Sequence, residues 1–443
     1  MSSKHESTTL RKLIRGESVG GITLIIAALF AMFVVNIPSL QGVLTSLGMD
    51  YVGWLQFSET FNAVLEYKVT IVVEHTVRYW INDLLMAIFF FTIGLEVKRE
   101  LFDPKGSLNT WGKRALPGVV AVAGVTLPAA IFVFFNSADA LAMKGWAVPT
   151  ATDIAFALGV LMLVGSKRVP LSVKVFLLAI AVLDDLIAVG VIALFYSADL
   201  NLTALAGAGL VLSVLVVQNL RNSNNFMSYG FLGVALWGCT LASGIHPTVA
   251  GLVTALTIPT TAKLGGNYSL LKTWEHELSP INAWVIMPLF ALANAGVNLA
   301  GVSSKDLFNS VTLGVTLALV FGKPIAVIGS AWLTTTFTSA ELPEGMTMKH
   351  LIGVGLLTGI GFTMSIFVAG LAYKDIAGYG TYSILAVLIS SSIMAVIGFM
   401  WCRLVFPEIK EEVVHVADAI EYKDNHVHQQ YQDNTLVDVD VTK

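Results

Sequence analysis

Charged residues are scarce in this sequence. Asp, Glu, Lys and Arg make up only 13% of its 443 residues, whereas 55% are hydrophobic and the mean hydropathy is +0.75. A soluble globular domain carries charge on about a quarter of its residues. The shortage excludes an ordinary soluble protein and predicts an integral membrane protein, for which we expect a lipid bilayer as surroundings and no nucleic-acid partner.

Cysteine is rarer still. Cys239 and Cys402 are the only two, and they lie far apart inside apolar stretches. That count excludes a disulfide framework and a CxxC metal or redox site. The motifs of intramembrane proteases are missing as well: no GxGD occurs, and the nearest approach to HExxH, residues 276–280, lacks the second histidine. We therefore expect a protein that is not an enzyme and uses no cofactor.

Long apolar runs are abundant. About 20 apolar residues in a helix cross the hydrocarbon of a bilayer, and about twelve runs of roughly this length occur. The sequence thus predicts an all-α polytopic protein of about twelve transmembrane helices. The spans centre near Ala27, Phe89, Gly124, Phe156, Asp184, Leu210, Leu236, Leu252, Leu289, Phe321, Phe362 and Ile393.

The basic residues indicate the orientation of these spans. With alternating sides, the loops and flanks on the side of both termini hold 18 Lys and Arg, and the opposite side holds only Lys68, Arg78, Lys144, Lys305 and Lys374. By the positive-inside rule both termini are cytoplasmic. We divide the chain into a cytoplasmic segment at 1–16, a membrane domain at 17–406 and an acidic tail at 407–443, whose polar composition is typical of disorder.

One long connection is predicted on the external side, at about 38–78. It contains AVLEYKVTIVVEH, whose β-branched run favours a strand or a small hairpin. Such a hairpin would suit contact with a second copy of the chain through edge pairing, giving a homodimer. A loop that only caps the helix ends is an equal alternative.

Four ionisable residues lie deep inside the predicted spans. Asp184 and Asp185 interrupt FLLAIAVLDDLIAVGVIALF near its middle, Lys323 lies about ten residues from each end of its span, and Asp153 follows PTAT. A charged group at such depth costs at least about 2.5 to 3.5 kcal/mol, so its presence indicates function. Neighbours on a helix diverge by about 100°, and we expect one aspartate to pair with Lys323 while the other meets water and ions. A closed charge network that only fixes helix packing is the alternative.

Two spans carry signs of interruption at mid-depth. Pro149 precedes Thr150, Ala151, Thr152 and Asp153 in the fourth span, and Gly359 and Gly361 flank Ile360 in the eleventh. Non-helical backbone at this depth occurs only where it is buried in protein or lines a cavity, although packing glycines are common in membrane helices. The fourth and eleventh spans are each the middle of a group of three, spans 3–5 and 10–12. This placement predicts an inverted-topology repeat with two discontinuous helices that cross at the functional site.

Seven segments of the sequence together resemble a known family. The segments INDLLMAIFF, GLEVKREL, ATDIAFALGVL, LDDL, FALANAGV, GKP and GIGFTMSIF resemble, in order and spacing, the NhaA family of bacterial sodium/proton antiporters over about residues 17–403. That family is itself an example of inverted repeats, so the repeat and the resemblance are not independent inferences.

The resemblance implies a pH-regulated antiporter in the bacterial inner membrane. It would export Na⁺, or Li⁺, in exchange for external protons, and so maintain cytoplasmic Na⁺ and pH. More than one proton moves per Na⁺ if the ion displaces protons from both Asp184 and Asp185, or from one aspartate and Lys323. In this family pattern Asp185 is the main ligand of Na⁺ and Asp184 its partner, which pairs with Lys323 when no ion is bound. Thr152 and Asp153 would lie where the broken helices cross. The candidates for the pH response are Glu96, Lys98, Arg99, Glu100, Glu275, His276 and His246.

The chemistry of the residues agrees with this implication. A carboxylate holds either a hard cation such as Na⁺ or a proton, and this mutual exclusion is sufficient for exchange. Carboxylates and broken helices also serve cation channels, which therefore stay open as an alternative. Coupled movement of protons and Na⁺, as against passive Na⁺ conductance, distinguishes the two.

Overall fold

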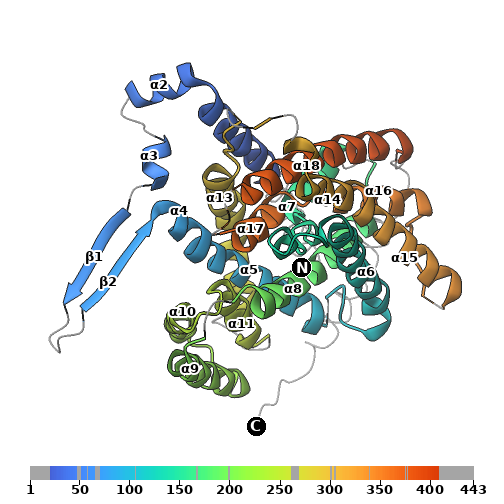
Figure 1. Ribbon diagram of the computed structural model, residues 1–443. Helices are drawn as coiled ribbons and strands as arrows, with labels where there is room; N and C mark the ends of the chain where they lie inside the picture. The colour runs from blue at the N-terminus through green and yellow to red at the C-terminus, as the bar shows by residue number, and fades with distance from the viewer. Residues whose placement is uncertain are drawn as a thin grey trace, which may run out of the picture.

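The computed structural model describes residues 20–408, apart from 47–50, 57, 65–69, 105, 166–167, 198–199, 261–268, 300–301, 304–305, 339, 375 and 377. The predicted cytoplasmic segment 1–16 and the acidic tail from residue 409 on lie outside the described residues. Within them the regular secondary structure is helical except for one hairpin (Figure 1).

Many of the described helices are long and apolar enough to cross a membrane. Eight runs meet this condition, and two sharply bent helix pairs raise the number to ten if each pair is one span. The sequence predicts about twelve. The other two expected spans fall on α11 (Thr248–Thr257), an apolar helix of only 10 residues, and on the segment 270–294, whose first half is polar.

The N-terminal part of the described chain leads from the bundle to the hairpin. The helix Gly20–Asn36 is followed at a bend of 97° by α2 (Pro38–Ser46), where proline fixes the turn. After α3 (Tyr51–Gln56), strands β1 (Ser58–Val64) and β2 (Thr70–Thr76) pair antiparallel, with Ser58 opposite Thr76. Figure 1 shows this hairpin projecting away from the helices.

The next group contains the first three long spans and the first interruption. The second expected span runs as one helix through α4 (Val77–Trp80), a π-helical turn (Ile81–Leu85) and α5 (Met86–Phe102). It is followed by α6 (Trp111–Asn136), two short 3₁₀ turns (Ala142–Gly145 and Val148–Thr150), α7 (Ile154–Leu163) and α8 (Leu171–Phe195).

A peripheral group of helices follows. α9 (Leu202–Leu220) and α10 (Phe226–Ser243) pack on each other and on α11. Gly244 ends α10 with φ of 86°, a backbone conformation that favours glycine. Only 11% of the apolar stretch of α9 is buried, so most of its surface is available to lipid.

The C-terminal half also contains long helices and interrupted helices. It comprises α12 (Leu270–Ile281), a π-helical turn (Asn282–Ile286), α13 (Met287–Asn294), a 3₁₀ turn (Asp306–Phe308), α14 (Ser310–Leu317), a π-helical turn (Ala318–Gly322), α15 (Lys323–Phe337), α16 (Met348–Thr358), α17 (Phe362–Ala372) and α18 (Tyr379–Val405).

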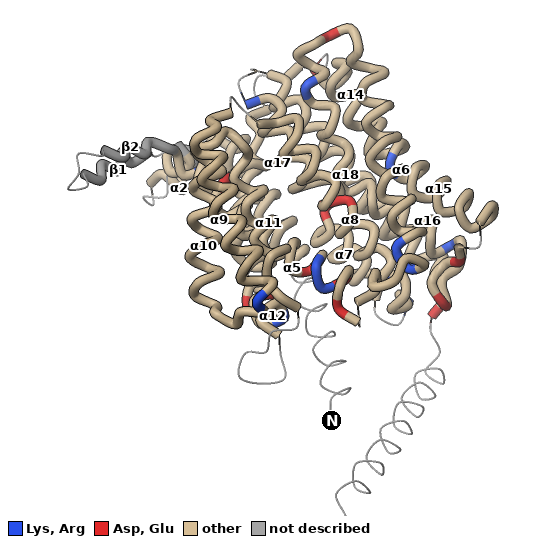
Figure 2. The backbone as a smooth tube through the Cα atoms, turned by 90° about the horizontal axis from the view of Figure 1, so that it is seen from below, with Lys and Arg blue, Asp and Glu red and all other residues tan. Residues whose placement is uncertain are grey.

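The most enclosed span is the interrupted one formed by α16 and α17. Of its apolar stretch 89% is buried, compared with 61% for α8. In Figure 2 the charged residues of the bundle gather mainly toward its two ends, but acidic positions also lie midway, where α8 is labelled. Broken backbone and buried charge therefore share the centre of the molecule.

Candidate functional site

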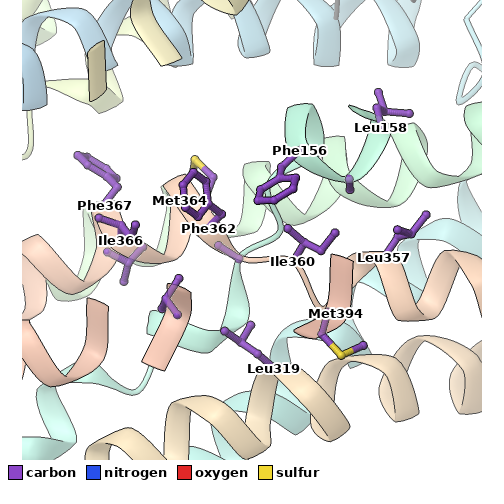
Figure 3. Packing of buried hydrophobic residues seen from close by; sticks show 14 of the residues in the cluster. Phe156, Leu158, Leu319, Leu357, Ile360, Phe362, Met364, Ile366, Phe367 and Met394 are labelled. Atoms are coloured by element: carbon purple, nitrogen blue, oxygen red, sulfur yellow. The ribbon is translucent and has the colours of Figure 1, made fainter. Parts of the chain in front are cut away.

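Two interruptions of helical structure lie against each other at this centre. Residues 151–153 precede α7, and residues 359–361 separate α16 from α17. The Asp153 amide donates to the Ile360 carbonyl at 2.8 Å, and the Thr152 hydroxyl donates to the Thr358 carbonyl at 3.2 Å. Figure 3 shows the apolar surroundings, in which the rings of Phe156 and Phe362 meet edge to face at 5.2 Å. Backbone groups that lose their helical hydrogen bonds at one interruption thus find hydrogen-bond partners in the other.

The glycines allow this close approach. A Cβ atom at Gly361 would lie 2.2 Å from the Ser365 hydroxyl oxygen and 3.2 Å from the Ala151 carbonyl oxygen. One at Gly359 would lie 2.7 Å from the Leu319 carbonyl oxygen. Pro149 lies in the first turn of the 3₁₀ segment before α7, where its missing N–H costs no helical hydrogen bond.

Asp153 connects the two half-helices through its carboxylate. Its Oδ1 accepts from the amide of Phe156 at 2.9 Å and caps α7. Its Oδ2 accepts from the amide of Thr363 at 3.0 Å and from the Thr363 hydroxyl. One fully buried negative group therefore faces the positive N-terminal ends of both α7 and α17.

Lys323 forms the buried ion pair of the site. Its Nζ lies 2.7 Å from Asp184 Oδ2 and also donates to the carbonyl of Thr150, beside the first interruption. Both side chains are 1% exposed. The π-helical turn 318–322 ends immediately before Lys323, and Pro324 follows it, so the span is locally deformed at the point where the lysine enters the site.

Asp185 has a different environment from its neighbour. It is 1% exposed, and neither of its carboxylate oxygens has a hydrogen-bond partner among the described residues. The second oxygen of Asp184, Oδ1, is likewise without a partner there. A buried carboxylate in this state requires a proton or a cation.

The chemistry offered to a cation is that of oxygen alone. Carboxylate, hydroxyl and carbonyl oxygens surround the interruptions, and in the described part of the chain no three His, Cys, Asp or Glu side chains converge as a metal-binding group. Hard cations prefer oxygen ligands. The oxygen donors at Asp184 and Asp185 therefore suit a hard cation such as Na⁺.

Comparison with known proteins agrees with this chemistry. The sequence profile of the family described as Na⁺/H⁺ antiporter 1 matches residues 11–402. The chain belongs to this family. The Na⁺/H⁺ antiporter NhaA of Vibrio vulnificus (strain YJ016) is 44% identical over 404 residues, 91% of this chain and 97% of the relative.

Relatives from other bacteria show similar identity. The Na⁺/H⁺ antiporter NhaA of Shewanella sediminis is 43% identical over 402 residues, 90% of this chain and 96% of the relative. That of Caulobacter vibrioides is 43% identical over 416 residues, 93% of this chain and 95% of the relative. The predicted family is confirmed. The chain is a multi-pass bacterial membrane protein of an antiporter family, and such proteins are secondary transporters rather than enzymes.

Four of the residues considered for a pH response lie together at the C-terminal end of α5 in this antiporter. Arg99 donates from Nε to both carboxylate oxygens of Glu275 on α12, at 2.8 and 2.9 Å, and its Nη1 lies 2.6 Å from Glu100. Lys98 donates to the Leu256 carbonyl at 2.6 Å. Glu96 is half-buried one turn earlier on α5, with its charge close enough to Arg99 to interact with it.

Of the two histidine candidates, His276 follows Glu275 directly, whereas His246 lies apart from this group. His276 is exposed on α12. His246 lies at the start of α11, the end opposite Leu256, where its Nδ1 is 2.7 Å from the Thr248 hydroxyl and its Nε2 is 3.7 Å from Asp83. The structure therefore does not bring all the pH-response candidates into one cluster.

Tyrosines hold the connection that leads to the first interruption. Tyr373, at the end of α17, donates to the Ala142 carbonyl at 2.6 Å, and Tyr196, at the end of α8, donates to the Lys144 carbonyl at 2.7 Å. The Tyr379 hydroxyl donates to Asp139 and holds the pKa of that carboxyl below its ordinary value. The approach to α7 is thus anchored from three helices.

Sequence reasoning missed several members of the site. Thr363 lies two residues after Gly361, and a hydroxyl so close to the interruption was a signal that could have indicated a contact there. The Thr150 carbonyl and Ser391 carried no such signal, because their contacts come from helices distant in sequence.

Proposed function

We propose that this antiporter exports Na⁺, or Li⁺, from the cytoplasm through the site at Asp184 and Asp185, in exchange for more than one proton. The observation that supports this function is the buried Asp185, whose two oxygens have no partner among the described residues, beside an ion pair that occupies Asp184. Such a carboxylate alternates between a proton and a cation.

The steps of exchange follow from the contacts. Na⁺ bound by Asp185 takes Asp184 as a second oxygen ligand, and it then competes with Lys323 for that carboxylate. Lys323, separated from its counter-charge in a buried place, releases its proton, and Asp185 releases the proton that it held. Two protons leave the site for each Na⁺ that enters, and two protons displace the Na⁺ on the other side of the membrane.

Unequal charge makes this exchange electrogenic. Two positive charges enter the cell for each one that leaves, so the inside-negative potential drives Na⁺ export with about 2.3 kcal/mol per 100 mV for each net charge. Low cytoplasmic pH keeps Asp185 and Lys323 protonated and Na⁺ unbound. Acid therefore inhibits transport at the site itself, before the groups at the end of α5 contribute.

We also propose the membrane arrangement that such a cycle requires. The chain would cross the inner membrane about twelve times with both termini cytoplasmic, and spans 3–5 and 10–12 would form inverted repeats. The similar order of a long helix, an interrupted helix and a long helix in α6–α8 and in α14–α18 supports this repeat. The hydrogen bonds between residues 151–153 and 358–363 support a crossing of the two interrupted helices at the site.

Asp185→Asn tests the proposed function. In sealed vesicles that hold a proton gradient, Na⁺ addition is expected to collapse the gradient with the natural protein and to leave it at background with Asp185→Asn, because an amide cannot exchange a proton for a cation. Glu341→Gln also replaces a carboxylate by its amide, but at an exposed position. It serves as the control and should transport at the natural rate. Gel filtration of both variants reports folding.

Two outcomes would contradict the proposal. A folded Asp185→Asn variant that still collapsed the gradient would refute the role of Asp185. Sodium flux through the natural protein without movement of protons would indicate a cation channel instead.

A further inference from the structure

The N-terminal end of α17 is held by a residue outside the two interrupted helices. The first four amides of a helix have no partner within it and need one elsewhere when they are buried. At α17, the amide of Thr363 donates to Asp153, and the amide of Phe362 donates to the hydroxyl of Ser391 at 3.1 Å. Ser391 is 1% exposed and belongs to α18.

Ser391 differs in this respect from the two serines beside it. Ser390 donates to the Ala386 carbonyl at 2.6 Å and Ser392 donates to the Leu388 carbonyl at 2.8 Å, both within α18. Hydrogen bonds of this kind give the serine hydroxyl an acceptor within its own helix and do not contact another helix. Among the three, Ser391 is the one whose hydroxyl accepts from α17.

We propose that Ser391 is a positioning residue of the exchange site, an inference that rests on the proposed function. Phe362 and Thr363 are adjacent, so the Ser391 contact fixes the end of α17 at the residue before the one that binds Asp153. Gly359 and Gly361 give the link between α16 and α17 little stiffness of its own. A hydroxyl on the neighbouring span α18 supplies the constraint that the link lacks.

The consequence concerns the affinity for Na⁺. Without the hydroxyl, the Phe362 amide is buried without a partner, and α17 shifts or turns to find another acceptor. One acceptor already bound to the adjacent residue is the carboxylate of Asp153, whose Oδ2 accepts from Thr363. Either adjustment alters the charge and position of the groups at the interruption, and so weakens Na⁺ binding relative to proton binding.

Substitutions at residues 390–392 test this inference. In sealed vesicles, Ser391→Ala is expected to raise the KM for Na⁺ about tenfold, the equivalent of one buried hydrogen bond, with a smaller change in the maximal rate per folded protein. Because protons then compete more effectively, the pH of half-maximal rate at fixed Na⁺ should also rise. Ser391→Thr keeps the hydroxyl and should restore both values toward those of the natural protein.

Ser390→Ala and Ser392→Ala are the matched controls, since each removes a serine hydroxyl from the same helix. They should leave the KM for Na⁺ and the pH profile unchanged. An unchanged KM in folded Ser391→Ala, or an equal rise in Ser390→Ala, would overturn the inference. If Ser391→Ala does not fold, Ser391→Cys, with a weaker acceptor, should give an intermediate rise in KM, and an unchanged KM there would overturn it as well.

The failure of this inference can be told from failure of the proposed function. A natural protein that moves no protons when Na⁺ is added contradicts the proposed function itself. Normal exchange by the natural protein together with normal KM values for the Ser391 variants contradicts only the positioning role.

Discussion

At the scale of single residues, the notable feature is that two adjacent aspartates have different environments. Asp184 binds Lys323, whereas Asp185 has no hydrogen-bond partner in the described residues. Their directions from α8 differ by about 100°, so the helix presents Asp184 to Lys323 and Asp185 in another direction, where we propose that it binds the transported ion. The cost of burying charge in a bilayer identified Asp153, Asp184, Asp185 and Lys323 from sequence. The same reasoning could not find Ser391, because burying a serine in a membrane helix costs little free energy.

Lys323→Ala should change the charge moved in each cycle. Without the lysine proton, one proton remains to be exchanged for each Na⁺, and transport becomes electroneutral at a rate reduced about tenfold or more. The loss of its partner leaves Asp184 buried and unpaired, so the melting temperature should also fall. The voltage dependence of Na⁺ uptake in vesicles checks the stoichiometry.

Lys349→Ala removes a lysine at an exposed position and serves as the control. It should keep electrogenic exchange and normal thermal stability. Voltage-driven transport that persisted in Lys323→Ala would show that the extra proton is carried elsewhere, with Asp184 the next candidate.

At the scale of elements, α5 and α12 are joined by an ion pair whose charge depends on pH. Arg99 binds Glu275 through both carboxylate oxygens, and Glu100 accepts from the amide of Ser107 at 2.6 Å. Arg99 therefore ties α5 to α12 while Glu275 is ionised. As pH falls and Glu275 takes up a proton, this ion pair is lost, and we propose that its loss contributes to the response of transport to acid.

Glu275→Gln should move the pH profile of transport to higher pH. The amide resembles the protonated carboxyl, so the junction stays in its acid form and the active state forms less readily. We expect the pH of half-maximal exchange to rise by about half a unit or more, measured from the initial rate of gradient collapse across pH. The neighbouring Glu277→Gln, at an exposed position of α12, should not shift the profile. A Glu275→Gln profile identical to the natural one would remove this junction from the pH response.

At the scale of the whole molecule, the hairpin and the ion site are far apart in structure. Figure 1 shows β1 and β2 projecting from the bundle, whereas the site lies among α7, α8, α15 and α17 inside it. The candidate site contains no residue of the hairpin. An edge of a two-stranded hairpin is free to pair with another strand.

If the hairpin joins two copies of the chain, as its edges predict, replacing residues 58–76 with a short Gly-Ser linker should convert that dimer to a monomer. Light scattering of the detergent-solubilised protein gives the mass, and vesicle assays should show exchange within about twofold of the natural protein. The matched control replaces only residues 65–69 and leaves both strands, so its oligomeric state should match that of the natural protein. A dimer that survived loss of both strands would place the contact between copies on another surface.

The sequence by itself determined that the chain is an apolar polytopic membrane protein, which family it resembles and which charges are too costly to be accidental. These follow from composition, span length and the cost of burying single groups, which are local properties. Only the tertiary structure decided which aspartate binds Lys323, that Asp153 caps two half-helices, that His246 lies apart from Glu275, and that Ser391 holds the end of α17. Each of these contacts joins residues of different helices, and their geometry depends on how the helices pack, which the spacing of residues along the chain does not specify.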